Sequence, residues 1–461
     1  MIIDKNGKKC RAKGEIMNNK EFSRKKWLIV ILFGMIGQIA WSVENMYFNL
    51  FVFDTIAPSL ESITLMVQLS GITATVTTLV MGTVSDKLGN RRSFISWGYL
   101  IWGVSVAIFG LISPEAVEKI FAVDSLRAVS VALVAVIVAD CVMTVFGSTA
   151  NDAAFNAWVT DNTEASYRGK VEGILSILPL IALLAVAGGF GILVNVLSYS
   201  IVFAILGIII SLCGVFGIFF IKDKDGLARS GSMKDIFYGF RPSVIKGNLP
   251  FYVSLLIIMI YGVACQIFMP YMIIYMSSYL GFSDLEYSAV FAIAILAGAA
   301  INVYLTRLSD KKDKVKLLYF AAAVMAAGLF AMYFSKGSNK TLNLIFFGIS
   351  GFVMISGYIF TSALTGSNLR DYTPTGDVGK LQGVRMVFSV LIPMLVGPAV
   401  GNAINASRGN RIPDTSSPDM MTTAYIPAPE IFLAAAITML LLFAVIPLLS
   451  YVIKRKNADK N

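Results

Sequence analysis

Long apolar stretches run along the chain, separated by short segments that are charged or rich in Pro, Gly and Asn. The clearest is 173–221, which contains no Asp, Glu, Lys or Arg. A hydrocarbon core of roughly 30 Å is crossed by about 20 apolar helical residues, so this stretch is long enough for two spans. The same pattern predicts twelve spans along the chain, near 27–53, 62–84, 93–112, 128–157, 173–195, 200–221, 250–278, 287–306, 317–335, 342–367, 385–406 and 430–453.

Composition agrees with this pattern. Of 461 residues, 56% are hydrophobic and 14% are charged, and the mean hydropathy is +0.73. One aqueous globule cannot bury that much apolar surface, so lipid must solvate it. The sequence therefore predicts an all-α integral membrane protein.

The basic residues predict an orientation. Of 38 Lys and Arg, only six fall in loops on one side, and the remaining 32 lie on the side that holds both termini; the six are Lys119, Arg127, Lys336, Lys340, Arg408 and Arg411. Cytoplasmic loops carry this excess, so both termini are expected in the cytoplasm and the protein in the plasma or inner membrane. The net charge of +10 then reflects loops beside anionic lipid, and nucleic-acid binding is not expected.

The chain reads as two halves. A polar segment, 222–249, links a first group of spans (27–221) to a second (250–453), with tails at 1–26 and 454–461. When the chain is compared with itself at an offset of 210 residues, eight pairs of positions are identical, among them Asp161 and Asp371. We expect two pseudo-symmetric six-helix bundles around a central cavity, an arrangement in which the solute binds between repeats.

The loop after the second span carries a motif, Gly82-Thr-Val-Ser-Asp-Lys-Leu-Gly-Asn-Arg-Arg92. It resembles the signature of the major facilitator superfamily, and the resemblance implies a transporter with a conformational gate here. Gly82 would allow close helix approach, Asp86 would cap the next helix or pair with a neighbour, and the arginines would anchor the loop. The gate residues are Gly82, Asp86, Lys87, Gly89, Arg91, Arg92 and, in the second copy, Asp310.

The segment 151–161, followed by Arg168, is similar to the end of the fourth span in glycoside-pentoside-hexuronide:cation symporters, the melibiose permease group. Ala153 stands where that group has a proline. This resemblance implies symport of a sugar with a cation.

Three carboxylates fall inside predicted spans: Glu44, Asp140 and Asp152. An ionised acid costs about 2.5–3.5 kcal/mol at a span centre, so each should meet water, a partner or a cation. All three lie in the first half, which predicts a proton or cation coupling site there. Alternatively, Asp152 is an interfacial acid, and the other two are hydrogen-bonded without a role in transport.

Polar residues at helical spacing predict a substrate cavity that offers neutral hydrogen-bonding groups and aromatic rings, which suit a sugar. Trp41 and Trp102 would stack on the solute or pack within the bundle; small and hydroxyl residues on the second span would equally serve helix packing. The candidates are Gln38, Trp41, Asn45, Gln68, Thr75, Trp102, Asn151, Asn156, Tyr358, Thr361 and Ser362.

Symport of a sugar or glycoside with Na⁺ or H⁺ is the function this sequence favours. The alternatives are a proton-coupled exporter of drug-like or lipid-like solutes and, from another class, a membrane receptor or enzyme. No histidine is present, so proton coupling would use carboxylates. No enzyme motif, cofactor or metal site is predicted, and the expected functional unit is a monomer.

Overall fold

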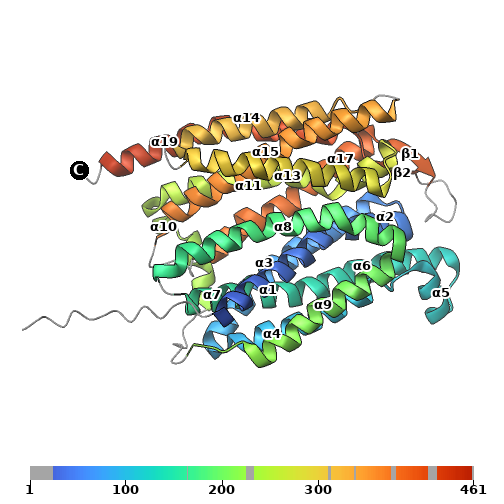
Figure 1. The fold of residues 1–461 in the computed structure, drawn as a ribbon, viewed down its shortest axis with the longest axis horizontal. Helices are drawn as coiled ribbons and strands as arrows, with labels where there is room; N and C mark the ends of the chain where they lie inside the picture. Colours follow the sequence, from blue (N-terminus) through green and yellow to red (C-terminus); the bar gives the residue numbers. More distant parts are fainter. Residues whose placement is uncertain are drawn as a thin grey trace, which may run out of the picture.

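The computed structural model describes residues 24–163, 165–224, 233–309, 313–336, 339–374, 381–413 and 423–458. Within these ranges, twelve helices are long and apolar enough to cross a membrane. Each overlaps one predicted span, so the predicted number of crossings is confirmed. The helices run side by side along the long axis of the molecule (Figure 1).

The helices of the first half pack mainly on one another, with α4 against α9, α1 against α8 and α3 against α6. Short α5 joins the third and fourth spans on the outside of the bundle. The elements are α1 (Arg24–Val43), η1 (Glu44–Phe48), α2 (Asn49–Thr55), α3 (Leu60–Leu88), α4 (Arg91–Phe109), α5 (Pro114–Phe121), α6 (Ser125–Gly147), η2 (Ser148–Phe155), α7 (Asn156–Asn162), α8 (Ala165–Leu197) and α9 (Tyr199–Phe220).

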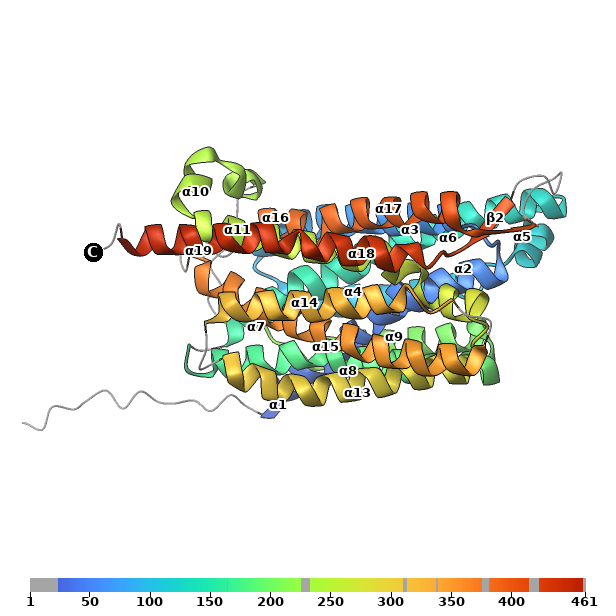
Figure 2. The same cartoon turned by 90° about the horizontal axis from the view of Figure 1, so that it is seen from above.

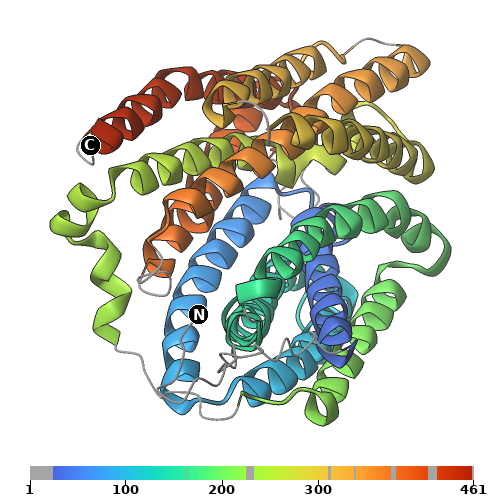
Figure 3. The ribbon, with the colours of Figure 1, turned by 60° about the vertical axis from the view of Figure 1, so that its left-hand side comes forward.

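The second half repeats this arrangement, and its yellow-to-red helices form a second group beside the blue-to-green helices of the first half (Figure 3). The predicted linker contributes two short helices, η3 (Met233–Phe240) and α10 (Pro242–Gly247). The remaining elements are α11 (Leu249–Phe268), η4 (Met269–Tyr271), α12 (Met272–Ile274), η5 (Tyr275–Tyr279), α13 (Asp284–Ser309), α14 (Lys314–Met332), α15 (Lys340–Tyr372), α16 (Gln382–Met386), η6 (Val387–Leu391), α17 (Ile392–Arg408), β1 (Asn410–Pro413), β2 (Thr423–Ile426), α18 (Glu430–Leu440) and α19 (Leu442–Ala458).

The start of α1 and the end of α19 lie at the same end of the bundle, which we call the termini end (Figure 2). The opposite end, called the far end, carries α5 and the antiparallel hairpin of β1 and β2, in which Asn410 pairs with Ile426. An even number of crossings requires this arrangement. Both described chain ends therefore lie on one side of the membrane.

Wide π-helical turns interrupt four of the spans. They are η1 in the first span, η2 in the fourth, η5 in the seventh and η6 in the eleventh. Such turns add a residue to the helical repeat and are frequent at functional sites. Glu44 begins η1, and Asp152 lies within η2, so two of the three predicted coupling acids stand on irregular helix.

The halves meet through two long helix pairs, α3 with α17 and α8 with α13. Glycines bring these helices close together. A Cβ on Gly71 of α3 would lie 2.6 Å from the Cβ of Met394, and one on Gly191 of α8 would lie 2.8 Å from the Tyr287 hydroxyl. These positions fix where the two bundles touch.

Candidate coupling and solute site

Glu44 and Asp140 lie together in the interior of the first half. The Ser70 hydroxyl on α3 donates to Glu44 Oε1 at 2.9 Å, and Asp140 on α6 is close enough to Glu44 for their charges to interact. Thr144 on α6 stands 2.9 Å from Ser70 and 3.5 Å from Glu44 Oε1, oxygen to oxygen. Three spans thus converge on one pair of acids, a juxtaposition the sequence could only suggest.

Both carboxylates are enclosed by protein. Glu44 is 8% exposed and Asp140 is 1% exposed. Glu44 Oε2 and Asp140 Oδ1 are buried without a hydrogen-bond partner. Two ionised acids side by side in such surroundings repel each other and lack solvation, so this arrangement favours uptake of a proton or a small cation.

Asp152 belongs to the same region. It is half-buried on η2, accepts a hydrogen bond from Ser148 Oγ at 3.2 Å, and is close enough to Glu44 to interact electrostatically. The three predicted acids are therefore neighbours. No group of three or more His, Cys, Asp or Glu side chains in the described part of the chain is arranged to hold a metal ion.

The two predicted stacking tryptophans contact each other. Their ring centroids are 5.0 Å apart at 45°. Trp102 is fully buried and packs beside Gly147, where an added Cβ would lie 2.8 Å from its ring. In this conformation Trp102 is a packing residue, whereas half-buried Trp41 still presents part of its ring.

The predicted amides of the first half separate into two kinds. Asn151 is buried and donates to the Tyr99 hydroxyl at 2.6 Å, and Tyr99 donates to the Phe33 carbonyl at 2.7 Å. That chain of bonds ties α4 to α1 and η2. By contrast, Asn45 and Asn156 are exposed and Gln38 is half-buried, so these three amides remain accessible.

On the second span, the predicted cavity residues serve structural contacts. Thr75 is buried and bonds to the Gly71 carbonyl of its own helix at 2.9 Å. Gln68 donates to the Leu395 carbonyl of α17 at 2.8 Å. Gln68 therefore joins the two halves in this conformation.

In the second half, Tyr358 and Ser362 are accessible, while Thr361 is fully buried. Tyr261 on α11, which the sequence pattern did not indicate, donates to the Tyr358 carbonyl at 3.3 Å. Its ring lies 5.8 Å from that of Tyr358. A single tyrosine in an apolar span gives no periodic signal, so only the fold could reveal this pair.

The motif loop forms a compact network at the termini end. Gly89 ends α3 with a left-handed φ of 61°, which glycine adopts without strain. Asn90, rather than the expected Asp86, caps α4 by accepting from the Ser93 amide at 3.0 Å. Asp86 instead pairs with Arg91, which is the alternative role that the sequence left open.

Arg91 is the centre of this network. It is 4% exposed, contacts Asp86 and the Ser85 hydroxyl, and donates to Asp161 Oδ2 at 3.2 Å. Asp223, after α9, accepts from the amides of Arg91 and Arg92 at 3.0 and 2.9 Å. The sequence did not indicate Asp223, because an acid in a polar loop gives no distinctive signal by itself.

Other gate residues behave differently from expectation. A Cβ on Gly82 would meet only Ala153, at 4.0 Å, so no close helix approach occurs there in this conformation. Lys87 is exposed, and Asp310 lies outside the described residues. The second half nevertheless repeats one bond of the network: Lys314 at the start of α14 pairs with Asp371 of α15 at 2.6 Å, as Arg91 of α4 pairs with Asp161.

Two side-chain contacts join the halves toward the far end. Thr64 near the start of α3 shares a 2.6 Å hydrogen bond with Tyr271, whose hydroxyl also donates to the Pro398 carbonyl at 2.9 Å. Gln68 bonds to α17 one turn further along α3. These contacts close the two halves against each other on the far side of the acid cluster.

Comparison with known proteins agrees with this architecture. The sequence profile of the Major Facilitator Superfamily matches residues 27–398. The fold is similar to the crystal structure of a mutant of the nucleoside transporter NupG, with a TM-score of 0.63 and 12% sequence identity over 92% of this chain and 99% of that one. No curated protein matches the sequence. The chain belongs to the Major Facilitator Superfamily, and it is a twelve-span membrane transporter of a small solute rather than an enzyme.

Proposed function

We propose that the protein is a secondary active symporter that moves a sugar or glycoside together with H⁺ or Na⁺ by alternating access. The observation that carries this proposal is the enclosed pair of Glu44 and Asp140, which lie close enough for their charges to interact. A bound H⁺ or Na⁺ would cancel one of the two negative charges and change the balance between conformations. That is the physical requirement for coupling an ion gradient to solute movement.

Both coupling ions suit the cluster chemically. A proton needs one carboxylate, and the chain has no histidine that would serve instead. Na⁺ is a hard cation that takes oxygen ligands, and the carboxylates of Glu44 and Asp140 with the hydroxyls of Ser70 and Thr144 supply such oxygens. Coupling to either ion requires no cofactor.

The accessible side chains support the proposed solute class. Asn45, Asn156 and Ser362 offer neutral donors and acceptors, and Trp41 and Tyr358 offer aromatic faces. A hydroxylated ring makes use of both kinds of group. NupG, whose fold is similar, is a nucleoside transporter, and a nucleoside also contains a hydroxylated ring, so nucleosides belong in the test.

We also propose the subfamily, the orientation in the membrane and the oligomeric state. The resemblance of segment 151–161 to the melibiose permease group supports a sugar:cation symporter. The distribution of Lys and Arg supports a termini end that faces the cytoplasm of the cell membrane. We propose that one chain is the functional unit.

An uptake panel in proteoliposomes tests the proposal. Sugars, glycosides, nucleosides, amino acids and dyes are offered under a Na⁺ gradient and separately under a proton gradient. We expect accumulation of a sugar-containing solute with only one of the two gradients. Accumulation of dyes by proton exchange, without sugar uptake, would replace symport by the export alternative.

A further inference from the structure

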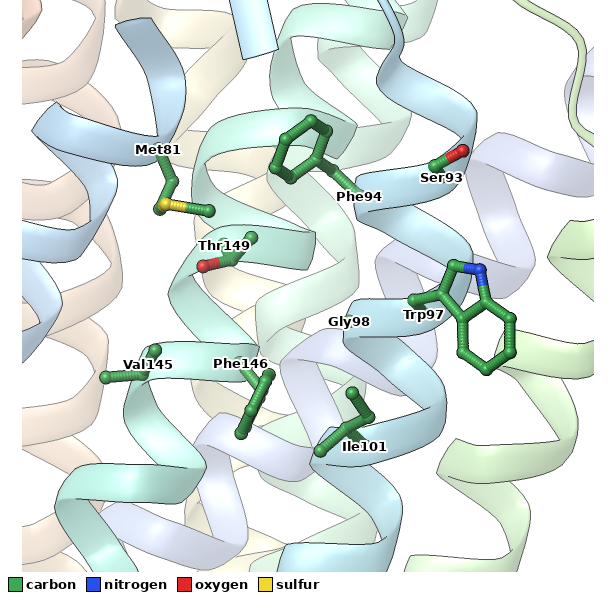
Figure 4. A pocket seen from close by; sticks show the side chains of 9 residues that line it. All are labelled: Met81, Ser93, Phe94, Trp97, Gly98, Ile101, Val145, Phe146 and Thr149. Atoms are coloured by element: carbon green, nitrogen blue, oxygen red, sulfur yellow. The ribbon is translucent and has the colours of Figure 1, made fainter. Parts of the chain in front are cut away.

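A groove of about 320 Å³ lies in the first half, and none of the three acids lines it. Its walls come from α3, α4 and the junction of α6 with η2, and they are built mainly from Met81, Phe94, Trp97, Ile101, Val145 and Phe146 (Figure 4). The volume falls within the range of small-ligand sites. The only side-chain hydroxyls in the lining are those of Ser93 and Thr149.

The groove opens toward lipid. On α6, Val145 continues an exposed apolar stripe that includes Val138 and Val142. Helical spacing puts this stripe opposite the face that bears Asp140 and Thr144, which point to the interior. An exposed apolar face on a membrane-spanning helix contacts acyl chains.

The wall formed by α4 has the same orientation. Trp97 is 57% exposed and begins a stripe that continues through Val104 and Ile108. From Ser93 to Ile101 the helix rises about 12 Å, so the groove runs along the bilayer normal at the depth of one leaflet. Its floor is tight: a Cβ on Gly98 would lie 2.6 Å from that of Ala150.

An exposed lysine lies at the termini end of α3, one of the helices that form the groove. Helices α3 and α4 form two walls of the groove, and the loop that joins them lies at the termini end. Lys87 in the last turn of α3 is exposed and makes no hydrogen bond or ion pair with any residue in the described ranges. The neighbouring Arg92 is engaged, because its guanidinium donates to the Ile218 carbonyl.

We propose that this groove holds one acyl chain of an anionic phospholipid whose headgroup pairs with Lys87. Lipid tails are as apolar as the groove, so apolar burial alone gives no preference over bulk lipid. Retention comes from close packing against the rings of Phe94, Trp97 and Phe146 and from the charge of Lys87. The site is therefore selective for the headgroup as well as shaped for a chain.

Quenching of Trp97 by lipid tests this proposal. The protein is reconstituted into phosphatidylcholine vesicles that contain, as a minor component, either phosphatidylglycerol or phosphatidylcholine with brominated acyl chains. Subtracting the fluorescence of the Trp97→Phe variant from that of the wild type leaves the emission of Trp97 alone. We expect brominated phosphatidylglycerol to quench Trp97 more strongly than brominated phosphatidylcholine at the same fraction.

Two substitutions on one exposed stripe locate the site. Val145→Phe fills the rim of the groove and should abolish the excess quenching, whereas Val142→Phe, one turn away and outside the groove, should preserve it. Lys87→Gln should reduce the preference for phosphatidylglycerol about fivefold, the effect of one basic residue beside anionic lipid. Equal effects of the two Phe variants would show that the groove is not the site.

Native mass spectrometry gives an independent measure. Wild-type protein washed in detergent should retain one phosphatidylglycerol molecule, and the Val145→Phe variant should retain none. Equal quenching by the two brominated lipids, or no retained lipid, would overturn the proposal. Neither the quenching measurement nor the mass spectrometry depends on transport. Failure of the lipid proposal can therefore be distinguished from failure of the proposed symport.

Discussion

Buried carboxylates determine the chemistry available to this transporter. Glu44 and Asp140 have enclosed oxygens without partners, and the Ser70 hydroxyl donates to the other oxygen of Glu44. In a low-dielectric interior each lost neighbour changes the energy of the charged state strongly. Single substitutions should therefore separate coupling from solute movement.

Glu44→Gln and Asp140→Asn should each abolish uphill accumulation while exchange of solute across the membrane continues. The amide cannot take up the coupling ion as a carboxylate does, but the solute path keeps its shape. Counterflow and gradient-driven uptake in proteoliposomes measure the two activities. Glu118→Gln, on exposed α5, is the control and should leave both intact. Undiminished accumulation in both variants would remove these acids from the coupling site.

Ser70→Ala should weaken coupling-ion affinity by about tenfold to hundredfold, because a hydrogen bond to a charged group contributes about 1.5–3 kcal/mol. The ion concentration that gives half-maximal uptake measures this change. Ser105→Ala is a matched control: its hydroxyl is also buried but bonds only to the Trp102 carbonyl of its own helix. An identical shift in the two variants would mean that loss of a buried hydroxyl, and not contact with the acids, is responsible.

At the scale of elements, the motif loop between α3 and α4 holds the termini end of the first half together. Arg91 contacts acids from α3 and α7, and Asp223 binds the amides at the start of α4. The sequence predicted the motif and its anchoring arginines. It did not predict that Asn90 makes the cap or that Asp223 completes the network, since both depend on where distant helix ends meet.

Arg91→Met should destabilise the first half by about 1.5–3 kcal/mol, because the charge-assisted hydrogen bonds of the buried guanidinium to the partly exposed Asp86 and Asp161 are lost. Thermal unfolding in detergent should show a clear fall in midpoint. Lys87→Gln removes a positive charge from the same loop but no interaction within the protein, so its midpoint should stay near that of the wild type. Equal midpoints for Arg91→Met and the wild type would show that the network does not support the fold.

At the scale of the whole molecule, the two bundles touch along glycines. Gly191 lets α8 approach α13, and the bonds from Thr64 and Gln68 lie in the same half of the membrane. The structure therefore shows the conformation in which the far end is closed. Alternating access requires these contacts to separate.

Gly191→Val should shift the population toward a conformation with the far end open, because its side chain would overlap Tyr287 and Ser288 of the other half. Spin labels at Ser200 and Leu285, in a background without native cysteines, would report a longer distance across the far end. Gly189→Val, on the same helix where an added Cβ meets nothing within 4 Å, is the control. An unchanged distance distribution in Gly191→Val would contradict the role of this contact in closure.

The amino-acid sequence by itself determined that lipid is the solvent, that twelve helices cross it, and that the chain carries a major facilitator motif. Hydropathy and charge are local along the chain, and so they can be read without a fold. Only the tertiary structure decided which side chains meet: Glu44 reaches Ser70 and Thr144 across 26 and 100 residues of sequence, and Trp102, Asn151, Thr75 and Thr361 lie buried. Spacing places a residue on a helix face, but helix packing decides whether that face meets a cavity, another helix or lipid.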